Sequence, residues 1–301
     1  MIVIMGATGA TGGATLRSLA DLGVPSRVLS RDPARLAASL DDRTRALVEV
    51  VPADAGDPAS LRRAFKGASQ LLLTMANGPR QVEYELSALE LAELSGIGHV
   101  VKISAPAAEP DSPVAISRGH HRIEERLRVA GLTATVLRPY AFMQKLLLLA
   151  PGIAAAGLVH GAMGQAPCNY VDCRDIGDVA AAVLTRPEIA GGTYHLTGGR
   201  AYSHGELAEL LTDLLGRPVR YLDLTPAQFH AHLVERAGMP DWLAAHVVEI
   251  QQLATLRPEA PDDIAARLTG RPPRTLEAFL REHLHLFQLA GGGARFRPID
   301  A

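Results

Sequence analysis

The chain has little cysteine, little lysine and no excess of charge of one sign. Among its 301 residues there are two cysteines, Cys168 and Cys173, and three lysines, Lys66, Lys102 and Lys145. The two cysteines exclude a disulfide framework, and their C-x₄-C spacing has no second pair, which argues against a zinc site. The formal net charge of −2 lacks the basic excess that is typical of a nucleic-acid-binding protein. We therefore expect neither a metal site nor a nucleic-acid partner.

Long hydrophobic runs are also missing. The longest apolar stretch, residues 146–159, is broken by Pro151 and Gly152, and it is too short to span a membrane. The N-terminus enters an apolar strand and shows neither the basic segment nor the cleavable segment of a signal peptide. The composition, 48% hydrophobic and 21% charged, is that of an ordinary globular protein. These features predict a cytoplasmic protein that makes no membrane contact.

Strand-like and helix-like segments alternate in the first part of the chain. Short apolar segments predict strands at residues 2–5, 27–30, 47–51, 70–74, 99–103 and 134–137. The segments between them predict helices at residues 14–22, 34–40, 59–65, 81–95 and 116–130. Near-continuous apolar strands between helices indicate a parallel sheet with helices on both faces. With right-handed crossovers, this pattern predicts a doubly wound α/β sheet of the Rossmann type.

The pattern loosens after Pro139. Further strands are predicted at residues 168–171, 193–196 and 219–222, and helices at 176–184, 204–215 and over most of 225–287. We therefore predict a Rossmann domain over residues 1–150, to which elements at about 167–200 return. A smaller, mainly helical substrate-binding lobe is predicted over residues 151–301. Met143 and the leucines at 146–149 are expected to build a lid and an apolar pocket.

The sharpest local signal is a glycine-rich loop between the first strand and the first helix. It reads Gly6-Ala7-Thr8-Gly9-Ala10-Thr11-Gly12-Gly13. Glycines at the first, fourth and seventh positions permit a tight turn, close backbone approach to a ligand and close helix–strand packing. The helix N-terminus then offers free N–H groups to a pyrophosphate. A purely structural turn is the alternative. We predict a dinucleotide site built from Gly6, Thr8, Gly9, Ala10, Thr11 and Gly12.

The end of the second strand predicts which dinucleotide binds. An NAD site usually has an acidic residue here, which accepts a hydrogen bond from the ribose 2′-hydroxyl. Arg31 stands in that place, and its guanidinium can pair with a 2′-phosphate. We therefore predict NADP(H). In the alternative interpretation Arg31 is a surface residue, and Asp32 is either the acid or the N-cap of a helix that begins at Pro33.

Two further loops follow predicted strands on the same edge of the sheet. Asp54 and Ala55 follow the third strand, where Asp54 could accept a hydrogen bond from the adenine amino group. Asp57 could cap the next helix, and either aspartate could instead be only a turn residue. The loop after the fourth strand would let the backbone approach a cofactor ribose through Met75, Ala76 and Asn77.

With three further stretches, the glycine loop resembles the NmrA-like family of atypical short-chain dehydrogenases/reductases. The stretches are residues 101–105 (VKISA), residues 120–143 with the motifs GLTATVLRP and Phe-Met, and residues 170–180 (YVDCRDIGDVA). The resemblance covers roughly residues 1–215 in matching order. It implies a Rossmann domain, bound NADP(H), and either a reductase or a redox-sensing regulator.

The chain departs from the short-chain reductase pattern at the proton donor. Typical members use Tyr-x-x-x-Lys, in which the lysine lowers the pKa of the proton-donating tyrosine. The resemblance places Ile116 at the tyrosine and His120 at the lysine, so the tyrosine is missing. It also places Lys145 where the family often has asparagine, and Tyr140 where a smaller residue is usual.

The resemblance therefore leaves four catalytic candidates. They are His120, Ser104, Tyr140 and Lys145, of which Ser104 matches a serine that orients the substrate carbonyl. Ser104, Tyr140 and Pro139 are also expected to contact the cofactor. Three of the four have a plainer alternative: His120 as an exposed helix residue, Tyr140 as a pocket wall, and Lys145 as a solvated side chain.

Two functions fit these observations. The first is an NADPH-dependent reductase of a small apolar or aromatic substrate, either quinone-like or a polyketide-type carbonyl compound. Hydride transfer to a quinone needs only a weak proton donor, which suits a site without the Tyr–Lys dyad. The second is a non-catalytic, NADP(H)-sensing regulator of the NmrA type that binds a partner protein. The expected apolar pocket favours the reductase, and we expect a monomer or a homodimer.

Overall fold

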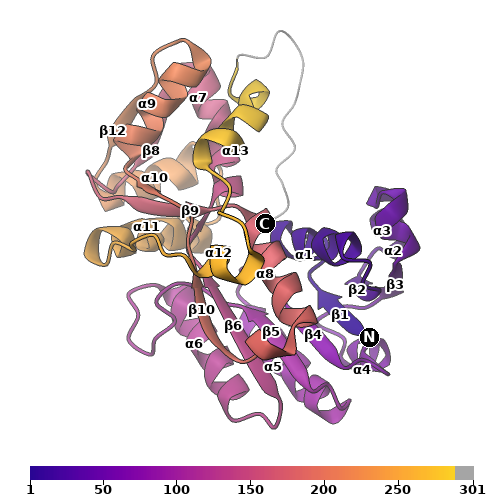
Figure 1. Ribbon diagram of the computed structural model, residues 1–301. Coiled ribbons are helices and arrows are strands. Elements are labelled where there is room, and N and C mark those ends of the chain that lie inside the picture. The colour runs from indigo at the N-terminus through magenta and orange to yellow at the C-terminus, as the bar shows by residue number, and fades with distance from the viewer. Residues whose placement is uncertain (289–301) are drawn as a thin grey trace.

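Seven parallel strands form the central sheet. The computed structural model describes residues 1–288, and residues 289–301 of the predicted lobe lie outside the described residues. The strand order is β3–β2–β1–β4–β5–β6–β10 (Figure 1), and each pair of neighbours is parallel. The strands are β1 (Ile2–Met5), β2 (Ser26–Ser30), β3 (Val48–Pro52), β4 (Gln70–Leu73), β5 (His99–Ile103), β6 (Thr133–Pro139) and β10 (Gly192–Leu196). The predicted Rossmann fold class is confirmed.

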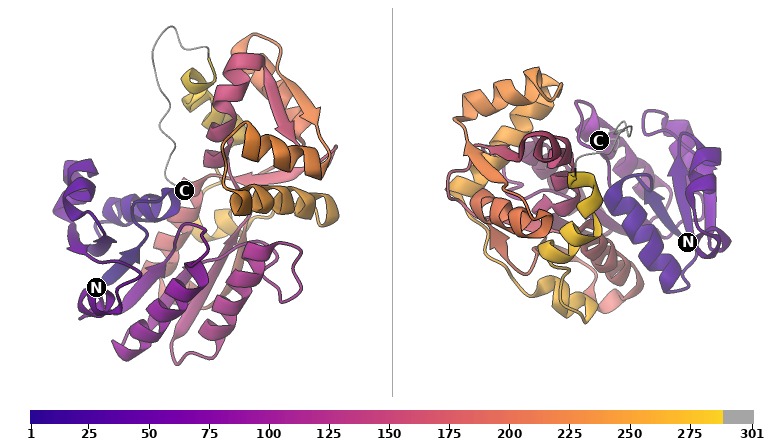
Figure 2. Two further views of the ribbon diagram at one scale, coloured as in Figure 1. Left: turned by 180° about the vertical axis from the view of Figure 1, so that it is seen from behind. Right: turned by 90° about the horizontal axis from the view of Figure 1, so that it is seen from above.

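Helices cover both faces of this sheet. The first face carries α1 (Ala10–Asp21), α8 (Cys173–Thr185), α2 (Pro33–Ser39) and α12 (Ile264–Thr269). The second face, which the view from behind in Figure 2 shows, carries α4 (Pro58–Phe65), α5 (Gln81–Leu94) and α6 (Ala115–Arg128). Because helices cover both faces, strands such as β5 are buried along their whole length. The short helix α3 (Asp42–Ala46) was not predicted.

Helices α1 and α8 approach each other closely across the first face. A Cβ atom built on Gly177 of α8 would lie 2.6 Å from the backbone carbon of Ala14, so only glycine permits this approach. Helix α8 begins at Cys173, three residues before the predicted start at Ile176. Its N-cap is Asp172, whose carboxylate accepts a hydrogen bond of 2.8 Å from the backbone N–H of Arg174.

The lobe lies beyond the carboxyl ends of the strands (Figure 1). It contains the parallel strands β8 (Leu158–Gly161) and β12 (Arg220–Asp223). Its helices are α7 (Ala150–Ala156), α9 (His204–Leu215), α10 (Pro226–Glu235), α11 (Asp241–Leu256) and α13 (Leu276–Glu282), with short 3₁₀ turns at 143–149 and 284–287. A three-stranded sheet joins the lobe to the Rossmann part; its order is β11 (Ala201–Tyr202), β9 (Cys168–Val171) and β7 (Ala141–Phe142).

The residues expected to build an apolar lid form the core of the lobe instead. Met143, Leu146 and Leu147 are at most 6% exposed and pack in one cluster with α9, α11 and α13. Leu148 is the exception, with 43% of its surface exposed. The prediction was wrong because an apolar stretch looks the same whether it faces a substrate or its own core.

The C-terminal part of the described chain returns to the Rossmann part before it ends in the lobe. Helix α12 packs on α8. The guanidinium of Arg274 then pairs with the carboxylates of Asp175 and Asp178, both on α8. The division of the chain near residue 150 stays a prediction. Among residues 1–288, no helix has the length and apolar character needed to cross a membrane.

Candidate active site

The three glycines of the loop after β1 have different surroundings. Gly6 has a φ of +87°, and a Cβ there would lie 2.2 Å from the backbone oxygen of Thr74. A Cβ on Gly12 would lie 2.2 Å from the oxygen of Gly6. By contrast, a Cβ on Gly9 would meet only the oxygen of Gly6, at 3.4 Å, and Gly9 is exposed. Gly6 and Gly12 therefore serve packing, while Gly9 leaves a face open to a ligand.

The N-terminus of α1 begins at this open face. Its N-cap is Gly9, and no side chain of the described residues caps the first turn with a hydrogen bond. The exposed residues Thr8 and Ala10 flank Gly9. Thr11 corrects part of the prediction: its hydroxyl is buried and donates to the Sγ of Cys173 at 3.8 Å, so it points to α8. Only the backbone N–H of Thr11 remains for an anion.

Arg31 and Asp32 follow β2, and the sequence left open which of them could contact a cofactor and which caps the next helix. Asp32 is the N-cap of α2, and its carboxylate accepts a hydrogen bond of 3.0 Å from the backbone N–H of Arg35. Pro33 occupies the first turn, as the capping interpretation required. The exposed Arg31 has no hydrogen bond or ion pair within residues 1–288. Its guanidinium is therefore available to a phosphate.

The loop after β3 presents Asp54 beside an aromatic ring. One carboxylate oxygen of Asp54 accepts a 2.8 Å hydrogen bond from the N–H of Gly56. Asp57 caps α4 by accepting from Ala59 at 3.0 Å, so one of the two aspartates is a capping residue. Tyr84 of α5 lies against Gly56, because a Cβ there would be 3.2 Å from the phenol oxygen. Ala55 is half-buried.

The loop after β4 connects the Rossmann part with the lobe. The side-chain nitrogen of Asn77 lies 3.5 Å from the Nε2 of His246, which belongs to α11. Met75 packs against the core under the second sheet face, and Ala76 is exposed. This loop therefore brings a lobe histidine to the carboxyl ends of the central strands, although sequence reasoning did not single out His246.

Ser104, directly after β5, donates its hydroxyl hydrogen to the carboxylate of Glu124 on α6. The same carboxylate pairs with the guanidinium of Arg138 on β6, whose Nε donates at 3.0 Å. The hydroxyl of Ser104 can still accept a hydrogen bond. Its predicted role as a donor to a substrate carbonyl would require the bond to Glu124 to break.

His120 is buried at the end of a chain of polar side chains. Lys102 of β5 and Glu85 of α5 form an ion pair of 2.6 Å, and both side chains are 0% exposed. The amide nitrogen of Gln81 lies 3.0 Å from the Oε1 of Glu85 and 3.3 Å from the Nε2 of His120. The Nδ1 of His120 is buried and has no hydrogen-bond partner within the described residues.

Burial changes the chemistry that was predicted for His120. Burial above all, then the positive charge of Lys102 and the neighbouring His246, holds the pKa of His120 well below its ordinary value. Burial also lowers the pKa of His246 to about 4, with a smaller contribution from Lys145. His120 is therefore neutral at pH 7. As a catalytic candidate, His120 is therefore a neutral ring that can donate an N–H.

Tyr140 and Lys145 lie on the lobe side of the site. The Tyr140 side chain is 7% exposed, and its hydroxyl has no partner among the described residues. Burial, followed by the proximity of Cys168 and Glu259, raises the pKa of this phenol. Ile116, at the position of the missing tyrosine, packs in the same apolar cluster as Tyr140. Lys145 is exposed, as its plainer interpretation stated.

Sequence reasoning missed the residues that hold His120. Gln81 and Glu85 looked like ordinary members of a long helix. The available signal was Lys102, a charged residue inside the apolar strand Val100–Ile103, because a lysine that is fully buried needs a charged partner. Lys102 is one of only three lysines in the chain.

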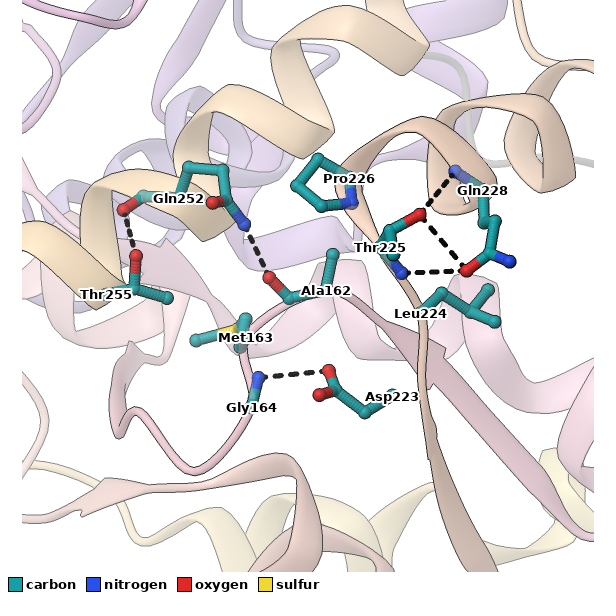
Figure 3. A pocket seen from close by; sticks show the side chains of 10 residues that line it. All are labelled: Ala162, Met163, Gly164, Asp223, Leu224, Thr225, Pro226, Gln228, Gln252 and Thr255. Atoms are coloured by element: carbon teal, nitrogen blue, oxygen red, sulfur yellow. Dashed lines mark hydrogen bonds between the residues drawn. The ribbon is translucent and has the colours of Figure 1, made fainter.

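A separate pocket of about 440 Å³ lies within the lobe (Figure 3). Its polar groups bind one another: the Gln252 amide donates to the Ala162 oxygen at 2.5 Å, and the Gly164 N–H donates to Asp223 at 3.0 Å. Its lining comes from the loops after β8 and β12 and from α10 and α11. None of the predicted site residues lines this pocket, so it is not part of the candidate active site.

The strand order, the open glycine loop and the uncapped N-terminus of α1 together define a Rossmann-fold protein of the dinucleotide-binding type. The family assignment follows from sequence comparison: residues 1–267 match the model of the NmrA-like family. The chain belongs to this family.

Two reductases are among its relatives. The chain is 32% identical over 296 residues to the NAD(P)H azoreductase of Xenophilus azovorans, with 96% of this chain and 100% of the relative covered. It is 35% identical over 288 residues to a (4-alkanoyl-5-oxo-2,5-dihydrofuran-3-yl)methyl phosphate reductase of Streptomyces griseus, covering 95% and 99% of the two chains. The NADPH-dependent quinone oxidoreductase of Escherichia coli, solved with NADPH, superimposes with a TM-score of 0.84 at 28% identity, covering 95% and 100%.

Proposed function

We propose that this protein is an NADPH-dependent oxidoreductase that reduces small, apolar, conjugated acceptors of the quinone or azo type, without a Tyr–Lys dyad. The observation that supports it most is a buried imidazole nitrogen of His120 that has no partner within residues 1–288. This nitrogen lies at the same edge of the sheet as the open glycine loop. The relatives support this class of acceptor. An azo group, a quinone and an oxo-dihydrofuran ring are all conjugated groups that can accept a hydride.

The residues present fit NADP(H) along the carboxyl edge of the sheet. The pyrophosphate would lie on the loop at Gly9 and the N-terminus of α1, and Arg31 would pair with the 2′-phosphate. Asp54 and Ala55 would border the adenine, and the loop after β4 the ribose. Near the nicotinamide we place Ser104, Pro139 and Tyr140. When bound, NADPH supplies the hydride.

The protein's own contribution is to hold the acceptor and to stabilise the charge that develops on it. We assign that stabilisation to the N–H of the neutral His120, because an electrostatic donor aimed at developing charge acts without proton transfer. Tyr140 and Lys145 would line the lobe side of the substrate site. We also propose that the protein is cytoplasmic and that the lobe binds the substrate.

Consumption of NADPH tests the proposal against a panel of three acceptors: a quinone, an azo dye and an aryl ketone. We expect turnover of the quinone and the azo dye. In the His120→Ala variant kcat should fall by about 100-fold, the scale for loss of one donor to a developing anion, with unchanged NADPH affinity. The neighbouring His121→Ala variant is the matched control, because His121 is half-exposed and lies outside the polar chain.

The alternative function has a distinct outcome. Tight NADPH binding with no turnover of any of the three acceptors would contradict the reductase and favour the NADP(H)-sensing regulator. Equal kcat values in wild type and His120→Ala would keep a reductase but remove the histidine from its chemistry.

A further inference from the structure

We propose that Gln81 is a positioning residue which fixes the tautomer of His120, so that the neutral ring presents its Nδ1–H to the reducible group of the substrate. The inference deepens the proposed function and rests on it for the identity of the substrate. Its structural part, the position of one proton, stands on the contacts of the protein alone.

The first step concerns the orientation of the Gln81 amide. Glu85 is ion-paired with Lys102 at 2.6 Å, so its carboxylate is acceptor-only. The group that faces this carboxylate at 3.0 Å must therefore be the amide nitrogen of Gln81 and not its oxygen. Glu85 and Lys102 thus hold the Gln81 side chain in one orientation.

The second step derives the tautomer of the imidazole from the orientation of this amide. The same amide nitrogen lies 3.3 Å from the Nε2 of His120, and an amide nitrogen can only donate, so it must donate in a hydrogen bond between the two. Nε2 must accept, so the ring hydrogen of the neutral imidazole resides on Nδ1. No acceptor for this hydrogen is found among residues 1–288, and the side chain is only 5% exposed.

The third step concerns what this N–H can bind. A buried N–H without an acceptor costs about 1–3 kcal/mol, so a ligand acceptor at this point is favoured. His120 lies on α6, which follows β5, and His246 of the lobe is close enough to influence its pKa. Open α/β sheets bind ligands at the carboxyl ends of their strands.

The reaction itself tells which atom of the substrate suits this donor. Transfer of a hydride to a quinone breaks the C–H bond of the reduced nicotinamide and oxidises that ring. The acceptor gains two electrons and one hydrogen and becomes a hydroquinone anion, which then takes a proton from water. The Nδ1–H of His120 would stabilise the negative charge that develops on the quinone oxygen or on an azo nitrogen.

The chain contains a matched control for this arrangement. At the other end of the sheet, the side-chain nitrogen of Gln70 lies 3.2 Å from the Nδ1 of His99, and the Nε2 of His99 lies 2.9 Å from the hydroxyl of Thr135. Both ring nitrogens of His99 therefore have partners within the protein. A Gln70→Met substitution makes the same chemical change as Gln81→Met beside a buried histidine that lacks a free N–H.

The experiment combines nitrogen NMR with kinetics. Histidine labelled with ¹⁵N reports the protonated ring nitrogen, and the His120→Asn variant identifies the signal of His120 among the 11 histidines. We expect the Nδ1–H form in wild type and a mixture of tautomers in Gln81→Met. In that variant kcat for a quinone should fall about tenfold, as for one hydrogen bond, with unchanged NADPH affinity. Gln70→Met should change neither the His120 signal nor kcat.

Three results would overturn the inference. An Nε2–H form of His120 in the wild-type protein contradicts it directly, even if Gln81→Met does not fold. A Gln81→Met variant that folds and keeps the Nδ1–H form shows that Gln81 does not set the tautomer. A changed tautomer with unchanged kcat shows that the position of the ring proton does not affect the reaction. If wild type reduces no acceptor, the proposed function fails, while the NMR result still decides the tautomer.

Discussion

Two glutamine–histidine pairs lie at opposite ends of the central sheet. At the amino end, Gln70 and His99 begin neighbouring strands, and both ring nitrogens of His99 are partnered within the protein. At the carboxyl end, Gln81 and His120 lie in the helices that follow those strands, and one ring nitrogen of His120 has no partner in the described part of the chain. Both pairs consist of a glutamine and a histidine, but they differ in how many ring nitrogens of the histidine have a hydrogen-bond partner.

The comparison shows how an imidazole that only supports the fold differs from one that is open to a ligand. A buried polar atom is normally paired, because leaving it unpaired costs free energy. The pair at the amino end obeys this rule. The pair at the carboxyl end departs from it at the edge where a doubly wound sheet binds its ligands, and it is anchored by a buried ion pair that the other lacks.

The largest effect should come from that ion pair. Replacing Lys102 by methionine leaves the carboxylate of Glu85 buried without its partner, and we expect the free energy of unfolding to fall by about 3–5 kcal/mol. Urea unfolding measures it. The double variant Lys102→Met/Glu85→Leu should recover most of the loss, because an apolar pair can replace a buried ion pair. If the single variant were as stable as the wild type, the ion pair would not anchor the Gln81–His120 pair, and this difference between the two pairs would disappear.

The next effect concerns the open face of the glycine loop. The side chain of a Gly9→Val variant should point to the space where a pyrophosphate would bind, and NADPH affinity should fall by about 100-fold or more, which corresponds to roughly 3 kcal/mol. A fluorescence titration measures it. Gly12→Ala is the contrast: its Cβ would meet the Gly6 oxygen at 2.2 Å, so it should mainly lower stability. Unchanged affinity in Gly9→Val would mean that this edge of the sheet does not hold the cofactor.

A smaller effect is expected at the phosphate that distinguishes the two nicotinamide cofactors. Loss of the Arg31 guanidinium in Arg31→Ala should weaken NADPH binding by roughly 10–200-fold, the range for a charge-assisted pair of about 1.5–3 kcal/mol. NADH has no 2′-phosphate, so its affinity should stay the same. Titrations of both cofactors against both proteins provide the test. An equal loss for NADH and NADPH would exclude a contact with the 2′-phosphate.

The smallest effect compares the two histidines by pH. Burial lowers the pKa of His99, and it lowers that of His120 further. The folded protein then binds fewer protons than the unfolded chain, so this stability is present above about pH 6.5 and is lost as the pH falls below it, by up to about 1.4 kcal/mol per pH unit for each histidine. Urea unfolding between pH 8 and 5 should show a flatter acid side in His120→Gln than in His99→Gln. The reverse order would contradict the larger lowering of the pKa at His120.

The fold could be predicted because its signals are local. The strands of the sheet were predicted to within two residues at each end, since buried parallel strands are short apolar runs between helices. The strands β7, β8 and β11 were not predicted. Two of them have only two residues, and β8 pairs with β12, which lies more than fifty residues later. The partner strand β12 was itself predicted, but nothing within residues 158–161 reveals a pairing with so distant a segment.

The cofactor side of the site was more predictable than the substrate side. The glycine loop and Arg31 lie directly after their strands, so topology alone places them at one edge. Thr11 was predicted to be part of the dinucleotide site, but its hydroxyl contacts Cys173, which lies 162 positions later in the chain. The leucines at 146–149 were assigned to a lid for the same reason: what covers an apolar side chain is decided by distant parts of the chain.

The sequence alone determined the Rossmann sheet, the glycine loop and the place of Arg31, because periodicity, turn residues and the chirality of crossovers act over short segments. Tertiary structure decided the chemistry of His120. Its ring meets Gln81 across 39 positions, and its pKa depends on how deeply neighbouring elements bury it. Burial and the partners of a polar atom are properties of the packed molecule. The same histidine on an exposed helix would be an ordinary titrating side chain.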